Sequence, residues 1–321
     1  MFSIEPVVRY TLLALFLTSL PPADARDNLS LLTFNVERLF DDRDDGMDEP
    51  ILSTGKYRGR IHSLARLLRD SVGTPEVIAL QEIENLRVLE DLAQALESAT
   101  RSYRAVLLTD AQASQINLGF LIDTRLKVGT VQRWFAGRNM DGRDIPLFSR
   151  PPLAVEVCAV ECVTLVNLHL RSMRGLGKPG KTRKVAEKRR QQAEAIARKV
   201  QSLLLQTPGA QLLLLGDFNA LPRSDQYVDV LGTIIGQPDQ ARPRWKSKDL
   251  LNPDLVDLTR QIPRKQRYSF IYRDRRQQID YAVASPPLAA RLHSIRFEPI
   301  NYRISDHAPL LVELDFPLPE G

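Results

Sequence analysis

The chain has 321 residues, 43% of them hydrophobic and 26% charged, with a formal net charge of +5 and a sequence pI of about 9.2. This composition is ordinary for a globular protein and excludes collagen-like, largely disordered and disulfide-dense small scaffolds. The length suffices to bury a large core, and the basic balance favours an anionic partner without separating nucleic acid from anionic lipid or small phosphates.

The N-terminal segment has the pattern of a signal peptide. Arg9 precedes an apolar run at residues 11–20, which is too short to span a bilayer. Two prolines follow, and then an Ala-Asp-Ala sequence that ends at Ala25, in the A-x-A form of a cleavage site. We therefore expect residues 1–25 to be removed and the chain to be exported to the periplasm or secreted, with no stable membrane anchor after cleavage. An uncleaved N-terminal anchor is the alternative.

From residue 31 onward, short β-type runs alternate with helical patterns, which indicates an α/β fold. The runs predicted as strands are residues 31–35, 77–81, 103–108, 117–122, 153–158, 162–169, 211–216, 268–272, 280–284 and 310–314. Apolar residues recur with helical spacing in residues 58–70, 85–98 and 181–205. Because no internal repeat and no linker divides the chain, we expect one domain over residues 26–321.

The sequence contains two cysteines, Cys158 and Cys162, with β-type runs on both sides of the pair. The pair is placed to close a hairpin, and a disulfide is expected there in an oxidising compartment. Two thiols four residues apart, with no neighbouring His or further Cys, make a poor zinc site. The alternative is a pair of free, half-buried thiols.

Several predicted strands end in a polar residue at the point where the chain leaves the sheet. Five segments share this form: TFNV at 33–36, LQE at 80–82, NLH at 167–169, GDFNA at 216–220 and SDHAP at 305–309. Such placement collects reactive groups along one edge of a rigid scaffold. Hard oxygen ligands such as Glu82 and Asp306 suit Mg²⁺ or Mn²⁺. The imidazoles of His169 and His307 are suited to contact a phosphate or to move protons.

Two further motifs are NLHLRS at 167–172, which extends the third segment, and QIDY at 278–281. Together the motifs resemble the deoxyribonuclease-I-like endonuclease/exonuclease/phosphatase superfamily, and the resemblance covers residues 31–314. The segments TFNVERLFDDRDD and VIALQEIEN look closest to a group of bacterial members. The resemblance is specific, because chance would have to supply all six motifs in order. It implies a four-layer architecture, in which a two-sheet β-sandwich is flanked by helices and a divalent-metal phosphodiesterase site lies at the strand ends.

The resemblance also implies a metal site. Glu82 would be the main ligand of the Mg²⁺ or Mn²⁺ ion, with Asn35 and Asp306 beside it. Phosphodiester hydrolysis builds negative charge on the phosphoryl group and the leaving oxygen, and a metal with imidazolium groups stabilises that charge. Taken singly, Asn35 is equally well explained as a turn residue at a strand end.

The remaining motif residues carry catalytic roles by the same resemblance. Asp217 would orient or activate the attacking water, and Asn219 would hold a phosphate oxygen. His307 would contact the scissile phosphate, held by Asp280, because a carboxylate on the far nitrogen favours the cationic imidazole. His169 would face the phosphate from the other side and protonate the leaving oxygen. The deoxyribonuclease-like branch supports this histidine with an acidic residue that no motif places here.

A basic segment follows His169: residues 171–190 contain nine Lys and Arg against one acidic residue, Glu187. Phosphate contacts of a polyanionic substrate are expected from four of them, Arg171, Arg174, Lys178 and Lys181. The alternative is a solvated loop and helix face. A second basic region, residues 264–276, contains the sequence YSFIY, whose alternation indicates a strand first and nucleobase stacking only second.

We therefore expect an exported, Mg²⁺-dependent endonuclease that acts as a monomer on DNA or RNA. A lipid or small-molecule phosphodiesterase or phosphatase of the same superfamily, such as a sphingomyelinase, is the alternative, although no apolar or aromatic membrane-docking loop follows residue 25. A catalytically inactive binding module is a third candidate. Retention of the whole motif set speaks against it, namely Glu82, Asp217, Asn219, Asp306 and His307.

Overall fold

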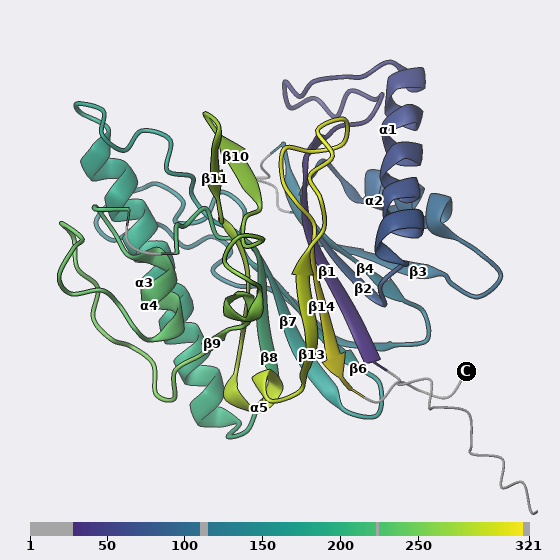
Figure 1. Cartoon of the computed structure of the whole chain (residues 1–321). Coiled ribbons are helices and arrows are strands. Elements are labelled where there is room, and N and C mark those ends of the chain that lie inside the picture. The colour runs from purple at the N-terminus through teal and green to yellow at the C-terminus, as the bar shows by residue number, and fades with distance from the viewer. Residues whose placement is uncertain (1–27, 110–114, 223–224, 317–321) are drawn as a thin grey trace, which may run out of the picture.

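Two six-stranded sheets pack face to face in the computed structural model, which describes residues 28–109, 115–222 and 225–316 (Figure 1). The predicted signal peptide lies outside these residues. The first sheet has the strand order β13 (Leu292–Phe297), β14 (Leu310–Asp315), β1 (Asn28–Leu39), β2 (Val77–Ile83), β4 (Asn117–Asp123) and β3 (Tyr103–Leu107). The second has the order β5 (Lys127–Arg133), β6 (Leu153–Cys158), β7 (Cys162–His169), β8 (Leu212–Asp217), β12 (Asp280–Ala284) and β9 (Val256–Asp257). A separate hairpin pairs β10 (Phe270–Tyr272) with β11 (Arg275–Gln277).

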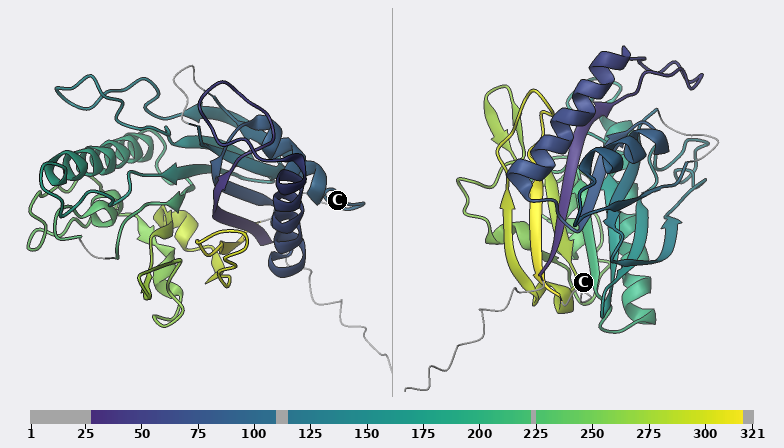
Figure 2. Two further views of the ribbon diagram at one scale, coloured as in Figure 1. Left: turned by 90° about the horizontal axis from the view of Figure 1, so that it is seen from above. Right: turned by 90° about the vertical axis from the view of Figure 1, so that its right-hand side faces the viewer.

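Helices cover the outer face of each sheet, as Figures 1 and 2 show. The first sheet carries α1 (Thr54–Arg66), which continues as a π-helical segment (Leu67–Val72), and α2 (Leu86–Leu96). The second carries α3 (Thr182–Gln206) and α4 (Val230–Ile235). A short α5 (Pro286–Ala289) and a 3₁₀ segment (Leu258–Gln261) flank β12 and β9. The expected four-layer sandwich is confirmed.

The core consists of three apolar layers, because neighbouring residues of a strand point to opposite faces of its sheet. In β1, Leu31 packs between the two sheets and Leu32 packs under α1 and α2. In β7, Leu165 packs between the sheets and Val166 packs against α3. The central strands of both sheets are therefore buried on both faces and are nearly continuous apolar runs.

The structure adds elements that the sequence patterns did not predict. β5 and β13 are edge strands with few buried residues, so they lack the apolar signal by which a strand is recognised. The first helix begins at Thr54, whereas the apolar spacing predicted a start at residue 58. The expected start was late because the first turn contributes only Tyr57 to the core.

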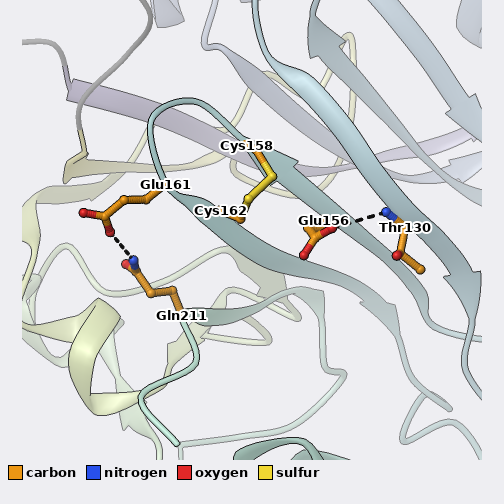
Figure 3. The surroundings of a disulfide bond; sticks show 6 residues. All are labelled: Thr130, Glu156, Cys158, Glu161, Cys162 and Gln211. Carbon is orange, nitrogen blue, oxygen red and sulfur yellow. Dashed lines mark hydrogen bonds between the residues drawn. A yellow bond between two sulfur atoms is a disulfide. The ribbon is translucent and has the colours of Figure 1, made fainter. Parts of the chain in front are cut away.

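The two cysteines form a disulfide, which confirms the expected pairing (Figure 3). Cys158 and Cys162 are directly opposite in the β6–β7 register, and the Ala159 N–H donates to Glu161 O in the turn between them. Gln211 Nε2 donates to Glu161 Oε2 at 2.6 Å.

In the described part of the chain, no helix combines the length and the apolar character needed to cross a membrane.

Candidate active site

Both sheets bring polar strand ends to one edge of the sandwich. β7 and β8 run parallel and β12 is antiparallel to β8, in a register that sets His169 beside Asp217 and Asp217 beside Asp280. β1 and β2 also run parallel, so Asn35 and Glu82 reach the same edge of the first sheet. Asn35 Nδ2 donates to Asp217 Oδ2 at 3.3 Å and thereby joins the two groups.

Irregular backbone aims these side chains. β1 and β2 are each bulged near their carboxyl ends, and Glu82 (φ 67°) and Asn219 (φ 49°) have left-handed backbone. Such conformations cost on the order of 1–3 kcal/mol in non-glycine residues and are typical of functional sites. Gly216 has φ 133°, and a Cβ there would lie 2.1 Å from Leu168 O. Glycine is therefore required where β8 passes β7 just before Asp217.

Asp217 occupies the centre of the cluster. Its carboxylate accepts hydrogen bonds from the Asn219 N–H (2.8 Å) and from Asn35 Nδ2 (3.3 Å), and it lies 3.3 Å from His169 Nε2. Burial, and then the neighbouring charge of Asp280, raise the pKa of Asp217 to about 7. A carboxylate with a pKa near neutrality is suited to take a proton from water.

Asn219 has its side-chain amide engaged within the protein. Its Nδ2 donates to Asp217 Oδ2 at 2.9 Å and to Leu170 O at 3.2 Å. Both N–H bonds of the amide are thus used, and none is left for the phosphate oxygen that the resemblance implied. In this arrangement Asn219 orients Asp217, and its contact to a phosphate oxygen stays a prediction.

Asp280 and His307 form a buried pair in which His307 Nδ1 lies 2.8 Å from Asp280 Oδ2. Burial opposes the imidazolium charge, but the carboxylate of Asp280 outweighs it and raises the pKa of His307 to about 10. Ser305 Oγ accepts from the His307 N–H at 3.0 Å and donates to Asn35 O at 2.6 Å. These contacts present a cationic imidazole to the site at neutral pH.

His169 is buried, with Nε2 3.3 Å from Asp217 Oδ2 and 3.8 Å from Glu82 Oε1. Burial, followed by the charges of Arg150 and His307, lowers its pKa well below 6.5, so the imidazole is neutral at pH 7. Its Nδ1 has no hydrogen-bond partner in the described structure, so the sought acidic residue is not bound to it there. A neutral imidazole can donate a hydrogen bond but holds no second proton to release. The geometry favours this donor role over the implied general acid.

One group of three Asp or His ligand atoms lies within 4.8 Å in the described residues: Asp217, Asp280 and His307. A protonated imidazole offers no lone pair, and the raised pKa of His307 keeps it protonated at neutral pH. The hydrogen bond to Asp280 further occupies its Nδ1. In this state the group is suited to charge and proton handling.

A second acidic group fits a divalent cation better. Burial, and then the negative charges of Asp306 and Glu82, raise the pKa of Glu37. Asn35 Nδ2 donates to Glu82 Oε1 at 3.4 Å. Arg60 donates to Glu37 O at 2.8 Å and counters part of the charge. Oxygen donors with excess negative charge are the set that Mg²⁺ or Mn²⁺ prefers. The predicted ligands Asn35, Glu82 and Asp306 supply oxygen donors of this kind.

Arg150 is a site residue that sequence reasoning missed. Burial lowers its pKa, and the charges of Glu82 and Asp217 act in the opposite direction. Its Nε is buried and lacks a hydrogen-bond partner among the described residues, so this N–H is a candidate donor to a phosphate oxygen. The sequence offers only one local signal, namely that this arginine precedes the two prolines before β6. Because the chain contains 44 Lys and Arg, this signal does not distinguish Arg150 from the others.

The basic segment after His169 surrounds a cavity of about 420 Å³. The predicted phosphate-binding residues all line it, together with Lys184: they are Arg171, Arg174, Lys178 and Lys181. Not every cation of the segment is available. Arg189 is buried and bonded to Asp225 Oδ2 at 2.9 Å and to Asn219 O, so it supports the fold beside the site. The tertiary structure thus distinguishes the cations that line the cavity from Arg189, which has a structural role.

Comparison with known proteins agrees with this geometry. The family model described as "Endonuclease/Exonuclease/phosphatase family" matches residues 30–311. Truncated TDP2 from Caenorhabditis elegans is 16% identical, with a TM-score of 0.56, over 89% of this chain and 97% of that chain. The 3′ phosphatase NExo from Neisseria, bound to a product DNA hairpin, is 19% identical, with a TM-score of 0.57, over 90% of this chain and 100% of that chain.

An endonuclease/exonuclease/phosphatase from Bacteroides vulgatus is 16% identical, with a TM-score of 0.57, over 89% of this chain and 98% of that chain. At these identities the structural likeness establishes the fold. No protein with curated annotation matches the chain. The family model spans nearly all of the described structure. The chain therefore belongs to the endonuclease/exonuclease/phosphatase family.

Proposed function

We propose that this chain is an exported, divalent-metal-dependent nuclease that hydrolyses phosphodiester bonds of DNA or RNA. Family membership supports a phosphoric-ester hydrolase in general. The observation that carries the choice of nucleic acid is the cationic cavity that begins two residues after His169. A polyanion gains from several phosphate contacts at once, which a small ester cannot make. The similar NExo structure, which holds product DNA, supports the same choice.

Asp217 prepares the attacking water in this mechanism. Held by Asn219 and Asn35, its carboxylate accepts a proton as the water oxygen bonds to phosphorus. A pKa of about 7 leaves Asp217 largely ionised above neutral pH and still basic enough to accept the proton. Attack in line with the leaving oxygen then breaks the bond between phosphorus and that oxygen, which takes up a proton from solvent water.

The charge that develops on the phosphoryl group is met from two sides. The imidazolium of His307, kept cationic by Asp280, donates from one side. The neutral His169 donates a hydrogen bond from the other, and the unpaired Nε of Arg150 supplies a further cation. Donors fixed before the reaction stabilise such charge without reorganisation. A divalent cation held by Glu82, Asp306 and Asn35 would add Lewis-acid stabilisation of the phosphate.

Export is part of the proposal. It is supported by the signal-like pattern of residues 1–25 and by the Cys158–Cys162 disulfide, because disulfides persist in oxidising compartments. Mass spectrometry of protein recovered from the native host should find an N-terminus at or near Arg26. An intact Met1 in the cytosolic fraction would contradict export.

The decisive experiment assays purified mature protein with Mg²⁺ or EDTA on a panel of substrates. The panel contains circular plasmid, single-stranded DNA, RNA, sphingomyelin and inositol phosphates. We expect metal-dependent cleavage of nucleic acid, and nicking of the circular plasmid indicates an endonuclease because that substrate has no ends. Turnover confined to sphingomyelin or inositol phosphates would replace the nuclease assignment with the alternative from the same family.

A further inference from the structure

The β10–β11 hairpin takes no part in the chemistry above, yet it projects from the second sheet at the edge where the active site lies (Figures 1 and 2). Arg273 (φ 49°) and Asp274 (φ 60°) connect its strands. Two central residues with positive φ define a type I′ turn, which usually contains Asn-Gly. Residues with side chains are strained in that conformation. The tight turn therefore places charged side chains at the tip at an energetic cost.

The base of the hairpin is bonded to the Asp280–His307 pair. Ser269 Oγ accepts from the Asp280 N–H at 3.1 Å, and Ser269 O accepts from the Ala308 N–H at 2.7 Å. Phe270 pairs with His307 as an isolated bridge, and their ring centroids lie 5.2 Å apart. Because Ser269 is fully buried, these bonds hold the hairpin in a constant position relative to His307.

The same face of the hairpin presents an aromatic ring farther out. Tyr272 lies two residues beyond Phe270, so both side chains point to one face, roughly 7 Å apart along the strand. Tyr272 is 49% exposed, and it pairs across the strands with Arg275. The Arg273 guanidinium lies 5.2 Å from the centre of the Tyr272 ring. An exposed ring thus stands two residues beyond Phe270, the residue that contacts His307, with arginines on both sides of it.

The arginines of this hairpin are available to a ligand. In the part of the chain that the structure describes, Arg273, Arg275 and Arg276 form no ion pair. Arg276 instead lies over the Tyr268 ring, 4.4 Å from its centre. Guanidinium groups recognise phosphate oxygens, and exposed rings stack on nucleobases of any sequence. A membrane-docking hairpin would carry apolar side chains at its tip, whereas this tip is Arg-Asp.

We propose that the β10–β11 hairpin is a stacking platform for the nucleobase that adjoins the scissile phosphate, with Tyr272 as the stacking ring and Arg273 and Arg275 on the flanking phosphates. The proposal rests on the proposed nuclease function. It predicts sequence-tolerant binding, because every nucleobase offers a flat face to an aromatic ring.

The test combines variants of Tyr272 with substrates that lack single bases. The substrates are a series of oligonucleotides with one defined cleavage position, and each carries a single abasic tetrahydrofuran unit at a different position. The kcat/KM of each substrate is measured for wild type, Tyr272→Ala and Tyr272→Phe. Tyr272→Ala should lower kcat/KM about tenfold on the intact oligonucleotide, which is the size expected for one lost stack. The loss should shrink to about twofold or less on the substrate without the stacked base. Tyr272→Phe keeps the ring and should match wild type.

Leu205→Ala, an exposed position at the end of α3, serves as a surface control and should match wild type. An equal loss in Tyr272→Ala on every abasic substrate, or no loss at all, overturns the platform while leaving the nuclease in place. A wild-type chain that cleaves no oligonucleotide overturns both proposals together. Binding to phosphatidylserine vesicles that Tyr272→Ala abolishes, with oligonucleotide turnover unchanged, would make the hairpin a membrane contact and overturn the platform.

Discussion

Gln81 Nε2 donates a hydrogen bond to Asn167 Oδ1 across 2.7 Å, and the bond connects β2 of one sheet to β7 of the other. Both residues are fully buried. Gln81 directly precedes Glu82, and Asn167 lies two residues before His169. Asn167 Nδ2 also donates to Leu80 O at 2.9 Å. This buried polar pair therefore holds the two sheets in the register that brings the metal-side glutamate to the imidazole.

Removing the amide of Asn167 should destabilise the fold. In Asn167→Ala, Gln81 Nε2 and the carbonyls of Leu80 and Gly119 each lose one hydrogen bond in a dry interior, and we expect a loss of about 3 kcal/mol in the free energy of unfolding. Urea denaturation measures it. In a double-mutant cycle with Gln81→Ala, the two losses should be less than additive, and strict additivity would show that the bond does not couple the sheets.

Gly216 should not tolerate a side chain. In Gly216→Ala the new Cβ would meet Leu168 O at 2.1 Å, in a backbone with φ 133°. We expect a loss of about 3 kcal/mol or more in thermal or urea unfolding. Gly59→Ala is the matched control, because it lies within α1 with open space around the added Cβ. That substitution should be neutral or slightly stabilising. Equal effects of the two would refute the steric account.

Glu82→Gln tests the metal assignment. The amide keeps the volume of the side chain but removes a charged ligand, so turnover and Mg²⁺ or Mn²⁺ affinity should fall by more than about 100-fold. Circular dichroism should show an unchanged fold. Glu90→Gln, an exposed position of α2, is the control for loss of one glutamate. Undiminished hydrolysis by Glu82→Gln, or by wild type in excess EDTA, would rule out a metal at this position.

The cationic cavity should determine how binding depends on salt. Neutralising Arg171, Arg174, Lys178 and Lys181 with Gln should flatten the plot of log affinity against log salt concentration, by up to about 0.7–0.9 for each lost phosphate contact. Turnover of bis-(p-nitrophenyl) phosphate, which is too small to span the site and the cavity, should change little.

A second quadruple variant controls for the overall change in charge. It replaces four exposed cations outside the cavity with Gln: Arg66, Arg104, Lys127 and Arg198. Its salt slope should stay close to that of wild type. An unchanged slope in the cavity variant, or a parallel loss on both substrates, would make the basic segment structural and would remove the main support for a polyanionic substrate.

Asp280 should set the upper pH limit of activity. The pKa of Asp217, about 7, places the rise of kcat/KM near neutrality, and the pKa of His307, about 10, places its fall in the alkaline range. Asp280→Asn removes the charge that holds the imidazolium, so the alkaline limb should move toward neutral pH. The pH profile of kcat/KM checks this. An alkaline limb that is unmoved in Asp280→Asn would show that His307 does not need its charge.

The same pair makes a prediction for stability. The pKa of His307 is higher in the folded chain than its ordinary value of 6.5, so the pair stabilises the fold fully below that pH. This contribution is lost as the pH rises through about 10. Urea midpoints of wild type should therefore fall over this window more steeply than those of Asp280→Asn. Parallel curves would contradict the coupling.

The sequence by itself determined the sandwich and most of its site. Buried strands are apolar on both faces, and such runs can be recognised locally, as in the strands predicted at residues 77–81 and 211–216. The polar residue that ends each run, such as Glu82 or Asp217, can also be recognised locally, because it follows directly on an apolar run. Edge strands β5 and β13 were missed because half-exposed strands carry little apolar signal.

Only the tertiary structure decided what each polar group does. Which atoms meet depends on the register between strands far apart in sequence, and this register gave Asp217 its bond from Asn35 and left the Nε of Arg150 without a partner among the described residues. The charge of an imidazole depends on its burial and its neighbours, so two histidines at similar strand ends differ: His169 is neutral, whereas Asp280 keeps His307 cationic. Local sequence carries neither distance nor burial, and both are set when the two sheets pack.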